Sequence, residues 1–167
     1  NKLYNAAFSV SSEILMKIPV IKKYFINHGL NSFFAEQAKK RLQNNLQYSY
    51  PKRIRAGYMG NLSIKYLDHS AILNTVKTNN DIEFYFIGNH LSNDSFITEL
   101  KKEANTSFIG VLKGQQLYDH LVGMDILFLC YKTQPGFYGD NSHKVMEYLS
   151  TGRPIVSSNL TCYRNND

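Results

Sequence analysis

The residues with the types and spacing to do chemistry lie near the carboxyl-terminal end of the chain: Ser142, His143, Lys144 and Glu147. The local pattern predicts a helix that begins here, with Asn141 or Ser142 as its N-cap. The free N–H groups of its first turn, together with the Lys144 ammonium, would attract a phosphate. Glu147 lies one turn further on nearly the same face, where a carboxylate accepts hydrogen bonds from the hydroxyl groups of a sugar. The alternative is that Lys144 and Glu147 form an exposed pair without function on an ordinary amphipathic helix.

The residues that follow predict the end of this helix and then a strand. Gly152 suits the position past the last turn, and Pro154 cannot continue the helix. Ile155 and Val156 come next and predict a buried strand. A loop, a helix, a turn and a strand therefore follow one another between residues 136 and 158, and the rest of the chain has to position them.

Strand and helix signals alternate from Lys52 onward, which is the pattern of a parallel sheet with crossover helices. The predicted strands are 54–59, 82–87, 107–109 and 125–130. The predicted helices are 66–76, 94–100 with Asp94 as its cap, and 115–121. Gly60, Gly88 and Gly110 each follow a strand, at the edge where open α/β sheets bind their ligands. The expected fold class is therefore α/β, a Rossmann-like open parallel sheet with helices on both faces.

The first 50 residues show a shorter alternation of the same kind. They predict, in order, a strand at 6–10, a helix from Ser11 or Ser12 through Ile21 with a break or kink inside it at Pro19, and a strand at 24–26. The second strand runs into a turn that contains His28. We interpret His28 as an ordinary turn residue without a chemical role.

Composition excludes several classes of protein. With 167 residues, of which 43% are hydrophobic, the chain can form one sizeable domain, or one domain and a piece of another. No apolar stretch reaches the roughly 20 residues that a transmembrane helix needs. Cys130 and Cys162 are too few for a disulfide framework or a zinc site, which favours a reducing compartment. The Gly-x-Gly-x-x-Gly and P-loop motifs are also absent from the sequence.

The chain carries a net charge of +6, from 19 Lys and Arg against 13 Asp and Glu. Its densest basic group surrounds a polar connection at 43–51 and consists of Lys39, Lys40, Arg41, Lys52, Arg53 and Arg55. These cations are not interleaved with stacking aromatic residues, so we expect no nucleic acid partner. A nucleoside diphosphate in a pocket and the anionic headgroups of a membrane surface both fit a moderately basic chain.

Residue types and their order resemble a known family. The segment NSHKVMEYLSTGRPIVSS is similar to the signature of group 1 glycosyltransferases, GT-B enzymes of family 4 type, at Lys144, Glu147, Tyr148, Gly152 and Pro154. The segments AGYMGNLS, FYFIGNH and TSFIGVLKGQQLYDHLVGMDILFLCYK occur in the order found in that family's second domain. The resemblance covers nearly the whole chain and implies the Rossmann-like C-terminal half of a GT-B enzyme.

The resemblance also implies a division of the chain into two parts. Residues 1–50 would be the tail of an N-terminal domain and the interdomain linker, because HGLNSFF is similar to the turn that closes the family's first domain. Residues 51–167 would be the nucleotide-sugar-binding domain, which we expect to be truncated at its C-terminus. The last residues, 161–167, should then be poorly ordered.

Each shared motif implies a contact with an activated sugar donor. The implied contacts are Gly60 and Asn61 with the phosphates, Val111 and Leu112 with the base, Ser142, His143 and Lys144 with the pyrophosphate, and Glu147 with the ribose. A lysine and a helix N-terminus would stabilise the departing diphosphate without a metal. We therefore expect neither a metal nor a cofactor, and the catalytic residues are left unassigned.

The sequence departs from the family's pattern at two places. Gly139, with Asp140 beside it, stands where the family usually carries a carboxylate that contacts the donor sugar. The identity of the sugar is thereby left open. Asn61 stands where arginine is common after the first glycine loop, and Lys65 is the candidate substitute, although we expect its side chain to be exposed to solvent.

The function implied by the resemblance is donor binding in a glycosyltransferase that moves a sugar onto a glycan or a lipid-linked acceptor, in surface polysaccharide synthesis. The acceptor would bind through the N-terminal domain, without which this fragment should be inactive. We expect a cytoplasmic location, with peripheral attachment to the inner face of the membrane as a variant. Two alternatives are a sugar-nucleotide epimerase of GT-B fold and a non-catalytic α/β binding module.

Overall fold

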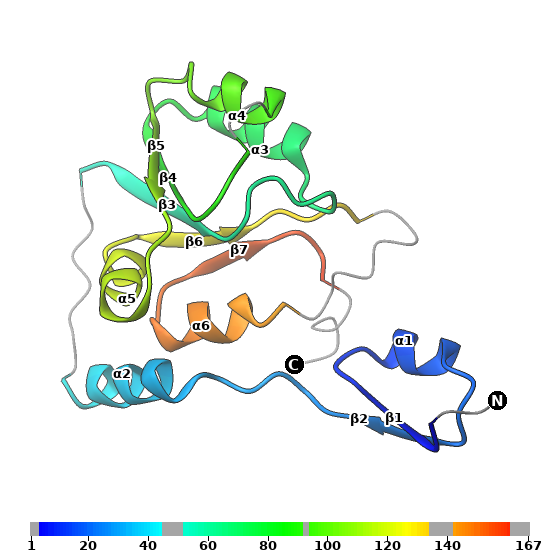
Figure 1. Cartoon of the computed structure of the whole chain (residues 1–167). Helices are drawn as coiled ribbons and strands as arrows, with labels where there is room; N and C mark the ends of the chain where they lie inside the picture. Colours follow the sequence, from blue (N-terminus) through cyan, green and yellow to red (C-terminus); the bar gives the residue numbers. More distant parts are fainter. Residues whose placement is uncertain (1–3, 45–51, 92–93, 134–141, 161–167) are drawn as a thin grey trace.

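The computed structural model of the chain describes residues 4–44, 52–91, 94–133 and 142–160 (Figure 1). Its centre is a five-stranded sheet with the strand order β5-β4-β3-β6-β7. These strands are β3 (Ile54–Met59), β4 (Ile82–Ile87), β5 (Thr106–Gly110), β6 (Ile126–Leu129) and β7 (Ile155–Ser157). Every neighbouring pair in the sheet is parallel. The predicted α/β fold with an open parallel sheet is therefore confirmed.

Helices cover both faces of this sheet. On one face lie α3 (His69–Thr78) and α4 (Ser95–Leu100), and on the other lie α5 (Gly114–Val122) and α6 (Lys144–Ser150) (Figure 1). A further helix, α2 (Ser32–Gln43), packs against α6 on the side away from the sheet. Because the strands are parallel, all of their carboxyl ends meet at one edge of the sheet.

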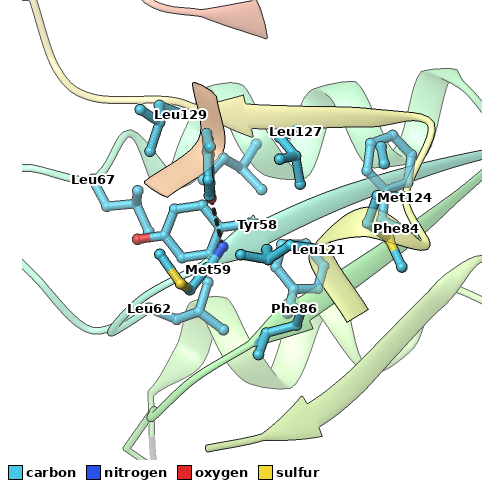
Figure 2. Packing of buried hydrophobic residues seen from close by; sticks show 14 of the residues in the cluster. Tyr58, Met59, Leu62, Leu67, Phe84, Phe86, Leu121, Met124, Leu127 and Leu129 are labelled. Carbon is cyan, nitrogen blue, oxygen red and sulfur yellow. Dashed lines mark hydrogen bonds between the residues drawn. The ribbon is translucent and has the colours of Figure 1, made fainter. Parts of the chain in front are cut away.

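The hydrophobic core surrounds the central strand, β3, whose residues 56–59 are all buried. A strand with a neighbour on each side and helices over both faces buries both sets of its alternating side chains. Figure 2 shows buried side chains of β3, of its neighbours β4 and β6 and of the loop before β6 gathered in this core. A Cβ atom on Gly57 would lie 2.6 Å from Cγ of Met124, so only glycine lets that loop approach β3 so closely.

A smaller unit precedes the main sheet. It consists of β1 (Ala6–Ser9), α1 (Ser12–Lys17) and β2 (Lys22–Phe25), with β1 and β2 parallel. The Ser11 side chain accepts a hydrogen bond from the Ile14 N–H at 3.3 Å and caps α1, which ends at Lys17 with Ile18 as its C-cap just before Pro19. The predicted order of strand, helix and strand is confirmed, but the helix does not continue past Pro19 to Ile21 as predicted, because the proline cannot extend it.

Helix α2 was not predicted, because HGLNSFF was interpreted as a closing turn and the basic residues after it as a solvated region. The Asn31 side chain accepts a hydrogen bond from the Phe33 N–H at 2.9 Å and caps the helix. Phe34 is only 5% exposed, and its ring centroid lies 5.7 Å from that of Tyr118 in α5. Thus α2 shares the core of the larger sheet although it lies within residues 1–50. The division of the chain at residue 50 remains a prediction.

Two other expectations were wrong. The helix expected from residue 66 begins at His69, because the Asp68 carboxylate accepts a hydrogen bond from the Ala71 N–H at 3.0 Å and acts as the N-cap. The strand predicted to be buried is β7, where Val156 is 58% exposed. This strand forms an edge of the sheet and has a neighbouring strand on one side only, so it is less covered than β3.

Candidate functional site

A pocket of about 300 Å³ lies at the carboxyl ends of β3 and β4, beside the start of α6. Its lining contains every residue predicted for the site except Ser142: Gly60, Asn61, Val111, Leu112, His143, Lys144 and Glu147. Met59, Ile87, Gly88, Asn89 and Leu117 complete the lining. Residues from four separate stretches of the chain therefore converge on one site, at the edge of the sheet where open α/β folds bind ligands.

Two glycines allow the floor of this pocket to form. The Gly60 N–H donates a hydrogen bond to the Ile87 carbonyl at 2.8 Å, so the loops after β3 and β4 lie against each other. Both glycines have positive φ angles, 146° at Gly60 and 141° at Gly88. A Cβ atom on Gly88 would overlap the Gly60 carbonyl, and one on Gly60 would lie 2.5 Å from Nζ of Lys144. Glycine at these two positions thus leaves room for the loop contact and for the lysine.

The Lys144 side chain extends from the first residue of α6 to the end of β3. Its ammonium donates a hydrogen bond to the Tyr131 hydroxyl at 3.3 Å and lies 5.6 Å from the ring centroid of Tyr58 and 5.8 Å from that of Tyr131. Aromatic ring faces stabilise a nearby cation. Burial lowers the pKa of the Lys144 ammonium, and the nearby Tyr66 and Glu147 oppose that shift. The lysine is therefore a partly desolvated cation beside the Gly60 loop.

Glu147 places a carboxylate in the same pocket. Burial raises the pKa of its carboxyl group, while His143 and Lys144 oppose the shift. Lys144 and Glu147 are both half-buried, and within the described part of the chain they make no ion pair with each other. The interpretation of Lys144 and Glu147 as an exposed surface pair is therefore wrong.

The start of α6 differs from the prediction. The helix begins at Lys144 with His143 as its N-cap and without a capping side chain, and Asn141 lies outside the described residues. The N–H groups of Val145 and Met146 donate to the carbonyls of Ser142 and His143, both at 3.1 Å. These N–H groups are already engaged, so the charge at this point comes from the Lys144 side chain more than from the helix terminus.

The opposite wall of the pocket is largely apolar. Gly110 ends β5 with a φ of 81°, and the next two residues, Val111 and Leu112, line the pocket together with Leu117 from α5. Val111 is 61% exposed, so its side chain presents an accessible apolar surface. An accessible apolar surface of this kind can pack against a flat heterocycle.

The other residues considered in the sequence lie outside the lining of the pocket or outside the described residues. Ser142 does not line the pocket, and its Oγ lies 3.3 Å from the Tyr131 hydroxyl. Lys65 is exposed and does not line the pocket, as expected. The ring of His28 lies edge-on to that of His143, with centroids 5.9 Å apart, so this turn residue lies next to the site. Gly139 and Asp140 lie outside the described residues.

Several residues near the site were missed in the sequence. Asn89 directly follows Gly88, and the rule that ligands gather after parallel strands could have indicated it. Tyr131 likewise follows the apolar run of β6. Leu117 carried no signal, because it is one of several apolar residues at helical spacing in α5.

Within the described ranges, no group of three or more His, Cys, Asp or Glu side chains is placed to hold a metal ion. The helices in those same ranges include none that is long and apolar enough to cross a membrane.

No family model and no curated protein sequence matches the chain. Solved structures do match it. A mutant of TarM from S. aureus, in complex with fondaparinux, alpha-GlcNAc-glycerol and UDP, superposes with a TM-score of 0.62 at 13% identity, over 94% of this chain and 30% of TarM. HepE from Anabaena, in complex with UDP and glucose, gives 0.56 at 15% identity, over 81% of this chain and 38% of HepE. WaaG, a glycosyltransferase involved in lipopolysaccharide biosynthesis, gives 0.52 at 10% identity, over 83% and 35%.

The chain has the fold of a GT-B half. The parallel sheet, its helices on both faces and the likeness to these glycosyltransferases agree with the fold that the sequence motifs implied. The chain spans less than two fifths of the length of each of the three proteins. The pocket described above therefore lies in a Rossmann-like domain that has the fold of one GT-B half.

Proposed function

We propose that this pocket binds the nucleoside diphosphate part of a nucleotide-sugar, and that the chain is the donor-binding half of a glycosyltransferase. The observation that carries the proposal is the pair of half-buried, opposite charges, Lys144 and Glu147, that line one pocket without pairing with each other. Partial burial of a charge costs free energy, and the shifted pKa values of both groups reflect that cost. Such costs are typical of binding sites, where a ligand supplies the missing partners.

The positions of the lining residues assign the parts of the donor. The diphosphate would bind between the Lys144 ammonium and the loop of Gly60 and Asn61, where a cation and accessible backbone are available. The ribose hydroxyls would donate to the Glu147 carboxylate, and the base would pack against Val111 and Leu112. TarM and HepE, to which the fold of this chain is similar, were solved in complex with UDP, which supports a nucleoside diphosphate as the kind of ligand.

In the transfer step, the bond between the sugar and the diphosphate breaks and negative charge grows on the departing phosphate oxygen. The Lys144 ammonium is placed to stabilise that charge, in a site where partial burial strengthens the interaction. The acceptor would be a glycan or a lipid-linked molecule, bound by a second domain. We further propose a cytoplasmic location, with attachment at the inner face of the membrane as a variant, and a role in polysaccharide synthesis.

The first experiment is a thermal-shift titration of the chain with UDP, GDP and ADP at millimolar concentration. A ligand that binds only the folded state stabilises it by RT ln(1 + [L]/Kd). At least one diphosphate should raise the melting temperature, and the increase should grow with concentration. If none of the three does so, the chain is better explained as a binding module without a nucleotide site.

Two substitutions then test the residue assignments. Lys144→Ala removes a charge-assisted contact to phosphate and should weaken diphosphates by about ten- to a hundredfold, with little effect on nucleosides. Glu147→Ala removes the partner of the ribose and should weaken nucleosides and diphosphates by similar factors. If both variants bind as the parent does, the site assignment is wrong.

A matched control is available in α4 and the turn after it. Glu99 and Lys102 form an exposed ion pair three residues apart, with side chains 40% and 62% accessible, and they do not line the pocket. Exposed pairs of this kind contribute little to stability. Glu99→Ala and Lys102→Ala repeat the same charge changes elsewhere and should leave nucleotide binding unchanged.

A further inference from the structure

Tyr131 lies next to the pocket, and the proposed donor contacts do not use it. It follows β6 and is only 5% exposed. Its N–H donates to Oγ of Ser158 at 3.0 Å, which ties its backbone to the end of β7. Its ring meets that of Tyr66 edge-on, with centroids 5.3 Å apart. Backbone and ring are both fixed, so the hydroxyl has a defined position.

That hydroxyl links two residues of the α6 start. The Lys144 ammonium donates to the Tyr131 oxygen at 3.3 Å, and the same oxygen lies 3.3 Å from Oγ of Ser142. An ammonium can only donate, so the Tyr131 oxygen accepts from it and its own proton is free to be donated to Ser142. Either oxygen of the Tyr131–Ser142 pair can be the donor. When Tyr131 donates, its oxygen becomes a better acceptor, and Ser142 then strengthens the contact with the lysine.

The other side of the ammonium is bounded by Gly60. A side chain there would occupy the space of Nζ and Cε of Lys144, because a Cβ atom would lie 2.5 and 2.7 Å from them. The lysine tip therefore lies between the Tyr131 hydroxyl and the Gly60 backbone, above the ring of Tyr58.

We propose that Tyr131 is a positioning residue, whose hydroxyl holds the Lys144 ammonium in its charged form against the Gly60 loop. The purpose of this positioning rests on the proposed function, since the Gly60 loop is where the diphosphate would bind. A tyrosine suits the task because it accepts a hydrogen bond without carrying a charge. A carboxylate in its place would neutralise the lysine and compete with the phosphate.

The surroundings of the ammonium support this role. Burial raises the pKa of the Tyr131 hydroxyl, so the group stays neutral around pH 7, although its hydrogen bond to Ser142 opposes the shift. The titratable groups that face or border the ammonium are Tyr58 from β3, Tyr66 from the loop before α3, Tyr131, His143 and Glu147, with His28 behind His143. Among the described residues, Tyr131 accepts the hydrogen bond that the ammonium donates.

The test is an NMR titration of the Lys144 side-chain ammonium in the ligand-free chain, assigned by the loss of its signal in Lys144→Met. Tyr131→Phe removes the acceptor and should shift the Lys144 pKa downward, because the charged form loses its partner. Ser142→Ala should shift it in the same direction by a smaller amount. Tyr118→Phe is the matched control, since it removes a buried tyrosine hydroxyl that donates to the Ser150 carbonyl at 3.2 Å. It should leave the Lys144 pKa unchanged.

A binding measurement follows with UDP and uridine. Tyr131→Phe should weaken UDP by about tenfold, the effect of one hydrogen bond to a charged group, and leave uridine unchanged. The loss of UDP affinity at alkaline pH should also begin at a lower pH than in the parent.

The outcomes separate the two proposals. If no diphosphate binds the parent but the Lys144 pKa still falls in Tyr131→Phe, the proposed function fails and the positioning role stands. If the Lys144 pKa is the same in Tyr131→Phe, Ser142→Ala and the parent, the positioning role is refuted whatever UDP does. Should Tyr131→Phe not fold, the Ser142→Ala titration alone decides, and an unchanged pKa there overturns the inference.

Discussion

Tyr148 connects the site helix to the central strand, and Tyr148→Phe tests that connection. The side chain of Tyr148 is fully buried, and its hydroxyl accepts a hydrogen bond from the Met59 N–H at 2.7 Å. The same hydroxyl lies 3.5 Å from the Phe128 carbonyl, to which it donates. Burial raises the pKa of this hydroxyl, which is therefore protonated throughout the neutral range. Met59 directly precedes Gly60, so this contact fixes the strand end that forms the floor of the pocket.

The loss of stability in Tyr148→Phe comes from the Met59 N–H, which loses its hydrogen-bond acceptor. The ladder between β3 and β6 pairs Ala56 and Gly57 with Ile126 and Leu127, and it does not extend to Met59. Phenylalanine fills the same space but leaves the Met59 N–H buried without an acceptor. An unpaired buried donor costs about 1–3 kcal/mol, which lowers the melting temperature of a chain of this size by about 2–12 °C.

Urea unfolding of the parent, Tyr148→Phe and Tyr118→Phe would measure this difference. The Tyr118 hydroxyl is a donor to a carbonyl, and a carbonyl that loses a partner is better tolerated than an orphaned N–H group. We therefore expect Tyr118→Phe to cost less than Tyr148→Phe. A Tyr148→Phe variant within about 0.5 kcal/mol of the parent, or no less stable than Tyr118→Phe, would refute the reasoning.

Three further predictions concern the pocket. Glu147→Gln should raise the free energy of unfolding at pH 7, because burial raises the pKa of the Glu147 carboxyl, and this gain should shrink as the pH falls through that raised pKa. Lys144→Met should also stabilise the chain at pH 7, because burial lowers the pKa of the ammonium, and this gain should shrink as the pH rises through the lowered pKa. Urea unfolding of both variants and the parent at several pH values measures these differences in the free energy of unfolding. A stabilisation of Glu147→Gln that grows as the pH falls, or of Lys144→Met that grows as the pH rises, would contradict the burial argument. Gly88→Ala should destabilise the chain by more than about 1 kcal/mol, because its φ is positive and the new Cβ would overlap the Gly60 carbonyl, and an unchanged thermal melt would exclude this.

Much of the fold could be predicted because its signals are local. The apolar runs of β3 and β4 were predicted with the bounds that the structure shows, and Asp94 caps α4 as expected, since it accepts a hydrogen bond from the Phe96 N–H at 3.0 Å. Such strands and caps depend on residues a few positions apart, which the sequence displays directly. Helix α2 was missed because its apolar face is narrow, and its burial depends on Tyr118, which is distant in the sequence.

The sequence by itself determined which residue types were available for the site and at which strand ends they would lie. Only the tertiary structure decided their state. From spacing alone, Lys144 and Glu147 could have been an exposed pair, whereas packing of α6 on the end of β3 half-buries both and directs the lysine to Gly60 and Tyr131. The physical reason is that the burial of a side chain depends on residues that are far apart in the sequence. The hydrogen bond between the Tyr148 hydroxyl and the Met59 N–H, for example, holds α6 against the end of β3, and the residues around Lys144 and Glu147 in the sequence do not reveal this contact.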